Sequence, residues 1–133
     1  MIEHLHFLSA LVATIVGMAV GALWYSPLLA GKAWLKEMGK PMEDLGDPKT
    51  SMAMSTVNMF IVALFLQIFM GETNTQGALA GAGLAIVIWL GFVATTQVLA
   101  VFFQGHTWRH FFIDTGNQFF CYLVMGAILG AWQ

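Results

Sequence analysis

Residues 5–34, "LHFLSALVATIVGMAVGALWYSPLLAGKAW", decide the fold of this chain. Residues 5–25 are almost wholly apolar, and about 20 such residues cross the hydrocarbon core of a bilayer as a helix. Pro27 has no amide hydrogen and disfavours a helical Ser26, so the helix is predicted to end or kink there. The stretch therefore predicts a membrane span followed by a sharp exit.

The residues around this exit are typical of a membrane–water interface. Trp24 and Tyr25 have amphipathic rings that favour the headgroup level, and Lys32 and Trp34 are predicted to follow on a short interfacial helix. Trp108 is predicted to be a similar anchor further along the chain. The motif could also grip a ligand, but anchoring and helix termination explain every residue in it.

The whole composition agrees with a membrane protein. Hydrophobic residues make up 59% of the 133 residues and charged residues 9%, whereas soluble domains carry about a quarter charged residues. Further apolar runs at 52–70, 79–103 and 111–132 bring the predicted spans to four, with Ser51 or Thr50 as candidate caps of the second. We predict an all-α integral membrane protein that forms one domain over residues 1–133.

The positive charges predict the orientation of the spans. The loop after the first span contains Lys32, Lys36, Lys40 and Lys49, and the loop before the fourth contains Arg109. The termini and the turn at 71–76 contain neither lysine nor arginine, so both termini are predicted to lie outside the cytoplasm. The expected location is the bacterial inner membrane, with lipids as neighbours and no nucleic-acid partner.

An internal repeat relates the two halves, about 1–71 and 72–133. A shift of 74 positions places "GKAW" (31–34) on "GHTW" (105–108), and a shift of 59 places "TVNMF" (56–60) on "TGNQF" (115–119). Each half reads as a helix, a Gly-x-x-Trp corner and a helix with Thr-x-Asn. We interpret the halves as parallel repeats about an axis along the membrane normal.

Polar residues within the spans are the candidate binding residues, because an unpaired amide in hydrocarbon is costly. Asn58 and Asn117 occupy matching repeat positions and are predicted to face each other or to cap nearby backbone. Gln97 should point into the bundle or into an oligomer interface, whereas Gln67 could reach the headgroups. Interhelical hydrogen bonding alone would also explain these amides.

His106, His110 and Asp114 follow a spacing of four residues, which places them on one face if the last helix begins near residue 106. Such a face could supply two metal ligands or accept protons. His4 and His6 are predicted on the other side of the membrane, so we expect no metal site and no cofactor. Asp114 could instead pair with Arg109 or with a lysine of the first loop.

Small residues four apart let helices approach closely, within one chain or between chains. The pairs are Gly17 with Gly21, Gly77 with Gly81, and Gly126 with Gly130. Four short helices bury little against one another, so we expect a homo-oligomer.

The segments "WYSPLLAGKAW" and "MGAILGAW" together resemble a bacterial membrane family defined only as a domain of unknown function, number 1761. The resemblance extends over essentially the whole chain. It implies four helices, and it implies no activity and no catalytic residues.

Two functions remain open on the sequence. The protein could bind or pass a small solute, ion or lipid, or it could be an accessory protein that acts through helix packing with partners. An enzyme is not expected, because the sequence offers neither a Ser–His–Asp set nor a metal quartet of suitable geometry.

Overall fold

The computed structural model describes residues 1–39 and 47–133, and this part of the chain is helical without strands. It contains the four predicted stretches that are long and apolar enough to cross a membrane. They are α1 (Phe7–Trp24), α3 (Pro48–Glu72), the stretch Ala78–Phe103 and α7 (Trp108–Ala131). Lys40 and the rest of the predicted polar connection over 40–46 lie outside the described residues.

The third stretch is divided into four segments, and two short helices precede the second stretch. The segments are α4 (Ala78–Ile88), the π-helical η3 (Trp89–Ala94), α5 (Thr95–Gln97) and α6 (Leu99–Phe103). The short helices are the 3-10 turn η1 (Ile2–His4) and α2 (Gly31–Met38).

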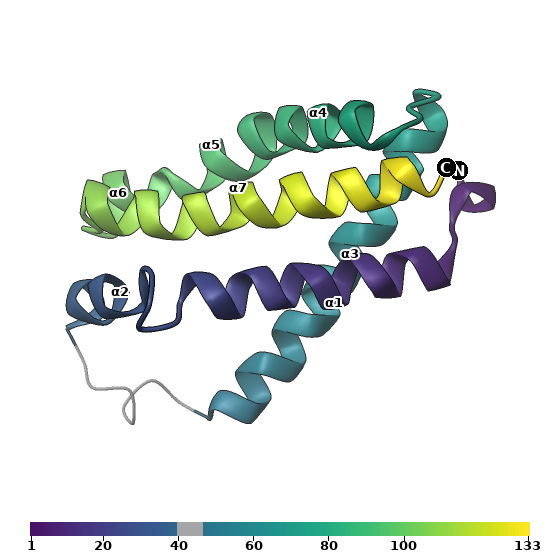
Figure 1. Cartoon of the computed structure of the whole chain (residues 1–133). Helices are drawn as coiled ribbons and strands as arrows, with labels where there is room; N and C mark the ends of the chain where they lie inside the picture. The colour runs from purple at the N-terminus through teal and green to yellow at the C-terminus, as the bar shows by residue number, and fades with distance from the viewer. Residues whose placement is uncertain (40–46) are drawn as a thin grey trace.

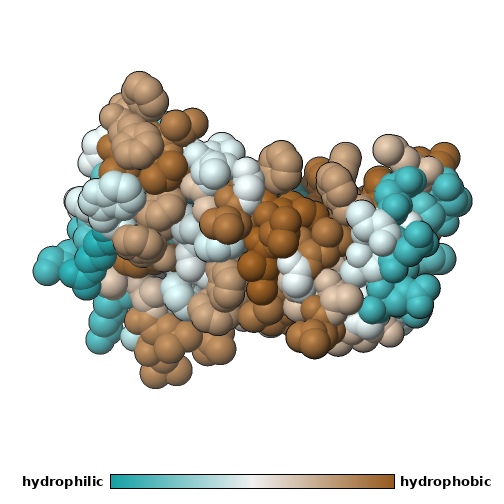
Figure 2. Space-filling model, turned by 90° about the horizontal axis from the view of Figure 1, so that it is seen from above, coloured by the Kyte–Doolittle hydropathy of each residue, from teal (hydrophilic) through white to brown (hydrophobic). Residues whose placement is uncertain are grey.

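Helix α7 lies at the centre of the arrangement, between α1 and the third stretch (Figure 1). Helix α3 packs on α1 and crosses it diagonally. We call the end with both chain termini and the α3–α4 turn the terminal end. The opposite end, with α2 and Arg109, is the basic end. Figure 2 shows hydrophobic side chains across the middle of one face and hydrophilic ones gathered at both ends, as expected for a spanning protein.

The first span ends where the sequence predicts. Helix α1 ends at Trp24, and the turn after it is closed by the Ala30 amide donating to the Trp24 carbonyl at 2.8 Å. The Gly31 amide donates to the Ser26 carbonyl at 3.0 Å, and a Cβ at Gly31 would lie 2.7 Å from that oxygen. Glycine is therefore required at residue 31 by close packing of the turn.

The start of α3 differs from the prediction. The helix begins at Pro48, and its cap is Asp47, whose carboxylate accepts the Lys49 amide at 3.1 Å and the Thr50 hydroxyl at 2.8 Å. Ser51 and Thr50 were the wrong residues for this cap. Asp47 followed by Pro48 is a favoured helix start, because the proline has no amide to satisfy.

Two of the glycine pairs pack α4 closely against α7. A Cβ on Gly81 would lie 2.8 Å from the Gly130 Cα, and one on Gly126 would lie 2.6 Å from the Ala85 Cβ. The Gly77 amide donates to the Gly130 carbonyl at 2.9 Å where the helices meet. These glycines serve contacts within the chain, which is one of the two uses that the sequence left open for them.

The tightly packed core lies in the half of the bundle nearer the terminal end. Buried residues of α1, α3, α4 and α7 fill it without charged groups. Its members are Ala10, Ala13, Met59, Ala63, Leu66, Met70, Ala85, Cys121, Tyr122, Met125 and Leu129.

The helix arrangement is not symmetric about one axis. A twofold relation between the halves would match the α1–α7 contact with an α3–α4 contact. Helices α1 and α7 pack along their length, whereas α3 and α4 meet only near the terminal end (Figure 1). The two Gly-x-x-Trp corners also differ, because Gly31 opens α2 whereas Gly105 has a positive φ of 71° in the loop before α7.

Candidate functional site

A buried histidine is paired with an aspartate at the basic end of α7. The Thr107 hydroxyl caps the helix by accepting the His110 amide at 3.0 Å. One turn further on, the Asp114 carboxylate oxygen Oδ2 lies 3.0 Å from the His110 Nε2. Residues four apart share one helix face, so the sequence spacing correctly places these two side chains together.

Tyr25 supplies the second partner of the carboxylate. Its hydroxyl donates to the Asp114 Oδ1 at 2.6 Å across 89 residues of sequence. Burial raises the pKa of Tyr25, and the hydrogen bond to Asp114 raises it further. The phenol therefore remains a donor throughout the physiological pH range, and both oxygens of Asp114 are held by side chains from the protein.

His106 joins this pair through a turn of the chain. Helix α7 begins at Trp108, so His106 lies in the turn just before the helix. The His106 amide instead donates to the Ala100 carbonyl at 3.2 Å, and its ring stacks on His110 with centroids 4.2 Å apart and planes 5° apart. Arg109 does not pair with Asp114, because its Nε lies 3.9 Å from the Glu37 Oε1.

Asp114 borders two hollows, one on each side of α7. The first has a volume of about 460 Å³ and lies between α7 and the end of the third stretch. The second, of about 470 Å³, lies under α2 beside Tyr25 and Trp34. Small-molecule sites commonly measure about 300–1,000 Å³. The polar residues that line the first hollow are Thr96, Gln97, Gln104, His106, Asp114 and Thr115.

Gln97 is fixed toward the bundle, as predicted. Its Oε1 accepts the Thr115 hydroxyl at 2.7 Å. The adjacent hydroxyls of Thr95 and Thr96 donate to carbonyls of their own helix at 2.8 and 2.6 Å. The glutamine amide nitrogen therefore remains beside the hollow that Asp114 also borders.

Asn58 and Asn117 line a third hollow, of about 330 Å³, between α1, α3 and α7. Asn117 is buried, with its Oδ1 near the Cys121 thiol at 3.7 Å, whereas Asn58 is exposed on α3. Among the described residues neither the predicted bond between the two amides nor backbone capping by them is found. Asn58 and Asn117 instead line the same hollow.

The second and third hollows adjoin each other at the basic end. Tyr25, Met52 and Ser55 border both the second hollow and the third. Beyond them, Gly17 is covered by Met125 and Met59, whose Sδ and Cγ atoms would lie 3.0 and 3.4 Å from an added Cβ.

Three of the five predicted anchors make contacts within the chain that the sequence does not reveal. The Trp24 Nε1 donates to the Ile113 carbonyl at 2.9 Å, and the Trp34 ring packs edge-on against Tyr25 at 5.5 Å. Lys32 and Trp108 remain exposed at the basic end. The aromatic residues of the corner thus build the wall of the candidate site.

Gln67 is the amide whose predicted position is wrong. It is fully buried, and its side chain accepts the His6 amide at 3.1 Å and donates to the His6 carbonyl at 2.9 Å and the Ser9 hydroxyl at 2.7 Å. It does not reach toward headgroups. It holds the segment before α1 against α3.

These features define a small all-helical protein of the multi-pass membrane class, with a polar site at one end of its spans. Residues 8–130 match the family described as "Protein of unknown function (DUF1761)", and the chain belongs to that family. No curated protein and no solved structure matches the chain.

Proposed function

We propose that the protein binds a small polar solute at its basic end, with the Asp114 carboxylate as the recognising group. The observation that carries this proposal is the position of Asp114 between two hollows of solute size. An ionised carboxylate only accepts hydrogen bonds. The solute is therefore one that donates them, such as an ammonium, a guanidinium or an amide.

The surrounding side chains support recognition rather than chemistry. Gln97, Gln104 and His106 add donors and acceptors around the first hollow. The carboxylate of Asp114 is the acidic group of this site, which favours a cationic solute. The lysines and Arg109 favour a cytoplasmic location for this end by the positive-inside rule, so the solute would enter from the cytoplasm, with both termini outside.

Binding is favoured over passage, because the half of the bundle nearer the terminal end is filled by a core in which Met125 and Leu129 are fully buried. In this conformation Asn58 and Asn117 would meet a solute only after it had passed Tyr25. The homo-oligomer and the bacterial inner membrane stay predictions, supported by the exposed apolar faces of the spans and by the family resemblance. The repeat rests on the sequence pattern alone, because the helix contacts do not follow a twofold axis.

Thermal unfolding of the purified protein in mild detergent tests the proposal. A panel of alkylammonium and guanidinium compounds should contain members that raise the melting temperature of the wild type. At ten times its Kd a ligand stabilises by about 1.4 kcal/mol. Asp114→Asn keeps the shape of the side chain and should abolish the shift. The control Asp47→Asn removes a carboxylate of the basic end that borders none of these hollows, and it should keep the shift.

A shift that persists in Asp114→Asn would contradict recognition by this carboxylate. If no compound acts and the wild type instead copurifies with a larger complex, the accessory function becomes the better explanation. The exposed first turns of α3, residues 47–58, would then be the surface available to a partner helix.

A further inference from the structure

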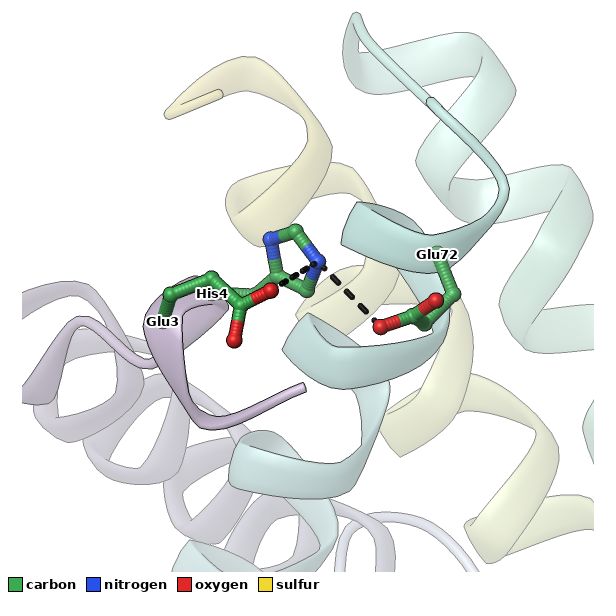
Figure 3. Close-up of side chains that lie close together, drawn as sticks. All are labelled: Glu3, His4 and Glu72. Atoms are coloured by element: carbon green, nitrogen blue, oxygen red, sulfur yellow. Dashed lines mark ion pairs between the residues drawn. The ribbon is translucent and has the colours of Figure 1, made fainter.

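A second group of polar side chains lies at the terminal end, far from Asp114 along the bundle. His4 belongs to η1, and Glu72 is the last residue of α3 (Figure 3). Together with Glu3 they place one nitrogen and two carboxylate oxygens within 4.8 Å of one another. Among the described residues this is the group of histidine and acidic side chains that meets in this way.

The spacing of these atoms suits a shared ion better than direct hydrogen bonds. The His4 Nε2 lies 3.8 Å from the Glu3 Oε1 and 3.4 Å from the Glu72 Oε1. Hydrogen bonds of this kind are shorter, about 2.7–3.2 Å. Two ligands of a tetrahedral ion that binds at about 2.0–2.2 Å are about 3.3–3.6 Å apart. The distances from the His4 nitrogen to the two carboxylate oxygens, 3.8 and 3.4 Å, are close to this separation between ligands of a tetrahedral ion.

Contacts independent of the carboxylates fix His4 beside α3. The Gln67 side chain forms hydrogen bonds with both the backbone amide and the backbone carbonyl of His6, which is two residues after His4. On α3, Gly71 leaves the space that the His4 ring occupies, because a Cβ there would overlap the ring. The nitrogen is thus held in place by the fold, and the site is formed before an ion arrives.

The charge at the terminal end also favours a cation. The lysine and arginine residues that the structure describes are Lys32, Lys36, Lys49 and Arg109, and they lie in segments of the basic end. The amino group of Met1 lies 2.6 Å from the Glu3 Oε2 and 3.6 Å from the Glu72 Oε1. It leaves the Glu3 Oε1 facing His4, and two carboxylates against one ammonium leave a net charge of −1.

We propose that Glu3, His4 and Glu72 bind a divalent transition-metal ion at the terminal end. Imidazole nitrogen with carboxylate oxygen is a donor set that suits Zn²⁺ and its neighbours. Three protein ligands leave a fourth position for water. The ion would tie η1 to the end of α3, and the site is independent of the solute site proposed around Asp114.

Isothermal titration with ZnCl₂ tests this site on the full-length protein in mild detergent, without a polyhistidine tag and without added N-terminal residues. The wild type should bind one Zn²⁺ per chain. His4→Ala and Glu72→Gln should each weaken that binding tenfold or more. His6→Ala is the matched control, because the His6 side chain is exposed and only its backbone is gripped by Gln67.

The variants separate the possible results clearly. Zn²⁺ binding that survives His4→Ala, or that is lost equally in His6→Ala, would overturn the proposal. So would a wild type that binds no Zn²⁺, or one that binds Ca²⁺ as tightly, since Ca²⁺ prefers oxygen ligands alone. Far-ultraviolet circular dichroism of each variant shows whether its helices are intact, and Glu72→Gln, at an exposed helix end, should leave them unchanged.

Discussion

Replacing Gly81 with alanine should separate α4 from α7, the two helices that pack most closely at the terminal end. The added Cβ would lie 2.8 Å from the Gly130 Cα, and it would overlap the Gly126 carbonyl oxygen. Both are backbone atoms, so the helices themselves must move apart. Overpacking of this kind typically costs 1–3 kcal/mol, and the better helix propensity of alanine returns at most about 1 kcal/mol.

Gly83 offers a matched control on the same helix. A Cβ at Gly83 meets nothing within 4 Å, so Gly83→Ala should be neutral or stabilising by up to about 1 kcal/mol. Gly81→Ala should lower the free energy of unfolding by about 1–2 kcal/mol. The assay is unfolding of the purified protein by titration with a denaturing detergent, followed by far-ultraviolet circular dichroism. Equal effects of the two substitutions would refute the close packing of α4 on α7.

Two further predictions concern the ends of the spans. Gln67→Leu removes three buried hydrogen bonds, two of them to the His6 backbone, and should cost about 2–4 kcal/mol in the same unfolding assay. The cap of α3 should depend on pH, because the Thr50 hydroxyl and the Lys49 amide hold the pKa of Asp47 below its ordinary value. Its contribution is present above the ordinary aspartate pKa of about 3.9 and is lost as pH falls through the lower pKa of the folded state.

Hydrogen exchange of the first amides of α3 measures the second effect. As pH falls and the Asp47 carboxylate protonates, the exchange rate of these amides should rise in the wild type relative to Asp47→Asn. The asparagine side chain of that variant carries no charge to lose. Parallel pH profiles in the two proteins would contradict the assigned cap. For Gln67→Leu, an unchanged free energy of unfolding would show that the hydrogen bonds to His6 are not formed.

The spans could be predicted from the sequence because each is a local property. About 20 apolar residues and a proline or glycine at the boundary suffice to place a helix, and Pro27 and Gly31 mark the first exit correctly. The pair of His110 with Asp114 is also local, since it follows from the helical period.

Contacts between distant segments could not be predicted in this way. Tyr25 and Trp24 suit a lipid interface by composition, yet their partners Asp114 and Ile113 are 89 residues away. Because Gln67 lies near the end of a span, the sequence predicts that its side chain reaches toward water. Its actual partner, the segment around His6, is known only from the fold. Only the packing of α1 against α3 and α7 brings these groups together.

The distribution of packing along the bundle explains where a solute could bind. The half at the terminal end is filled by apolar side chains such as Leu66, Met70 and Leu129. The half at the basic end contains hollows, because α3 diverges from α7 as it leaves the core (Figure 1). The polar groups of the loosely packed half, such as Gln97 and His106, border open space beside Asp114.

Native mass spectrometry of the wild type and Asp114→Asn, released from mild detergent, tests solute binding even when the chemical identity of the ligand is unknown. It reports the number of subunits and any retained molecule together. Binding at Asp114 predicts one small molecule per chain in the wild type and none in Asp114→Asn, with the same number of subunits in both. A molecule retained equally by the two proteins would contradict it.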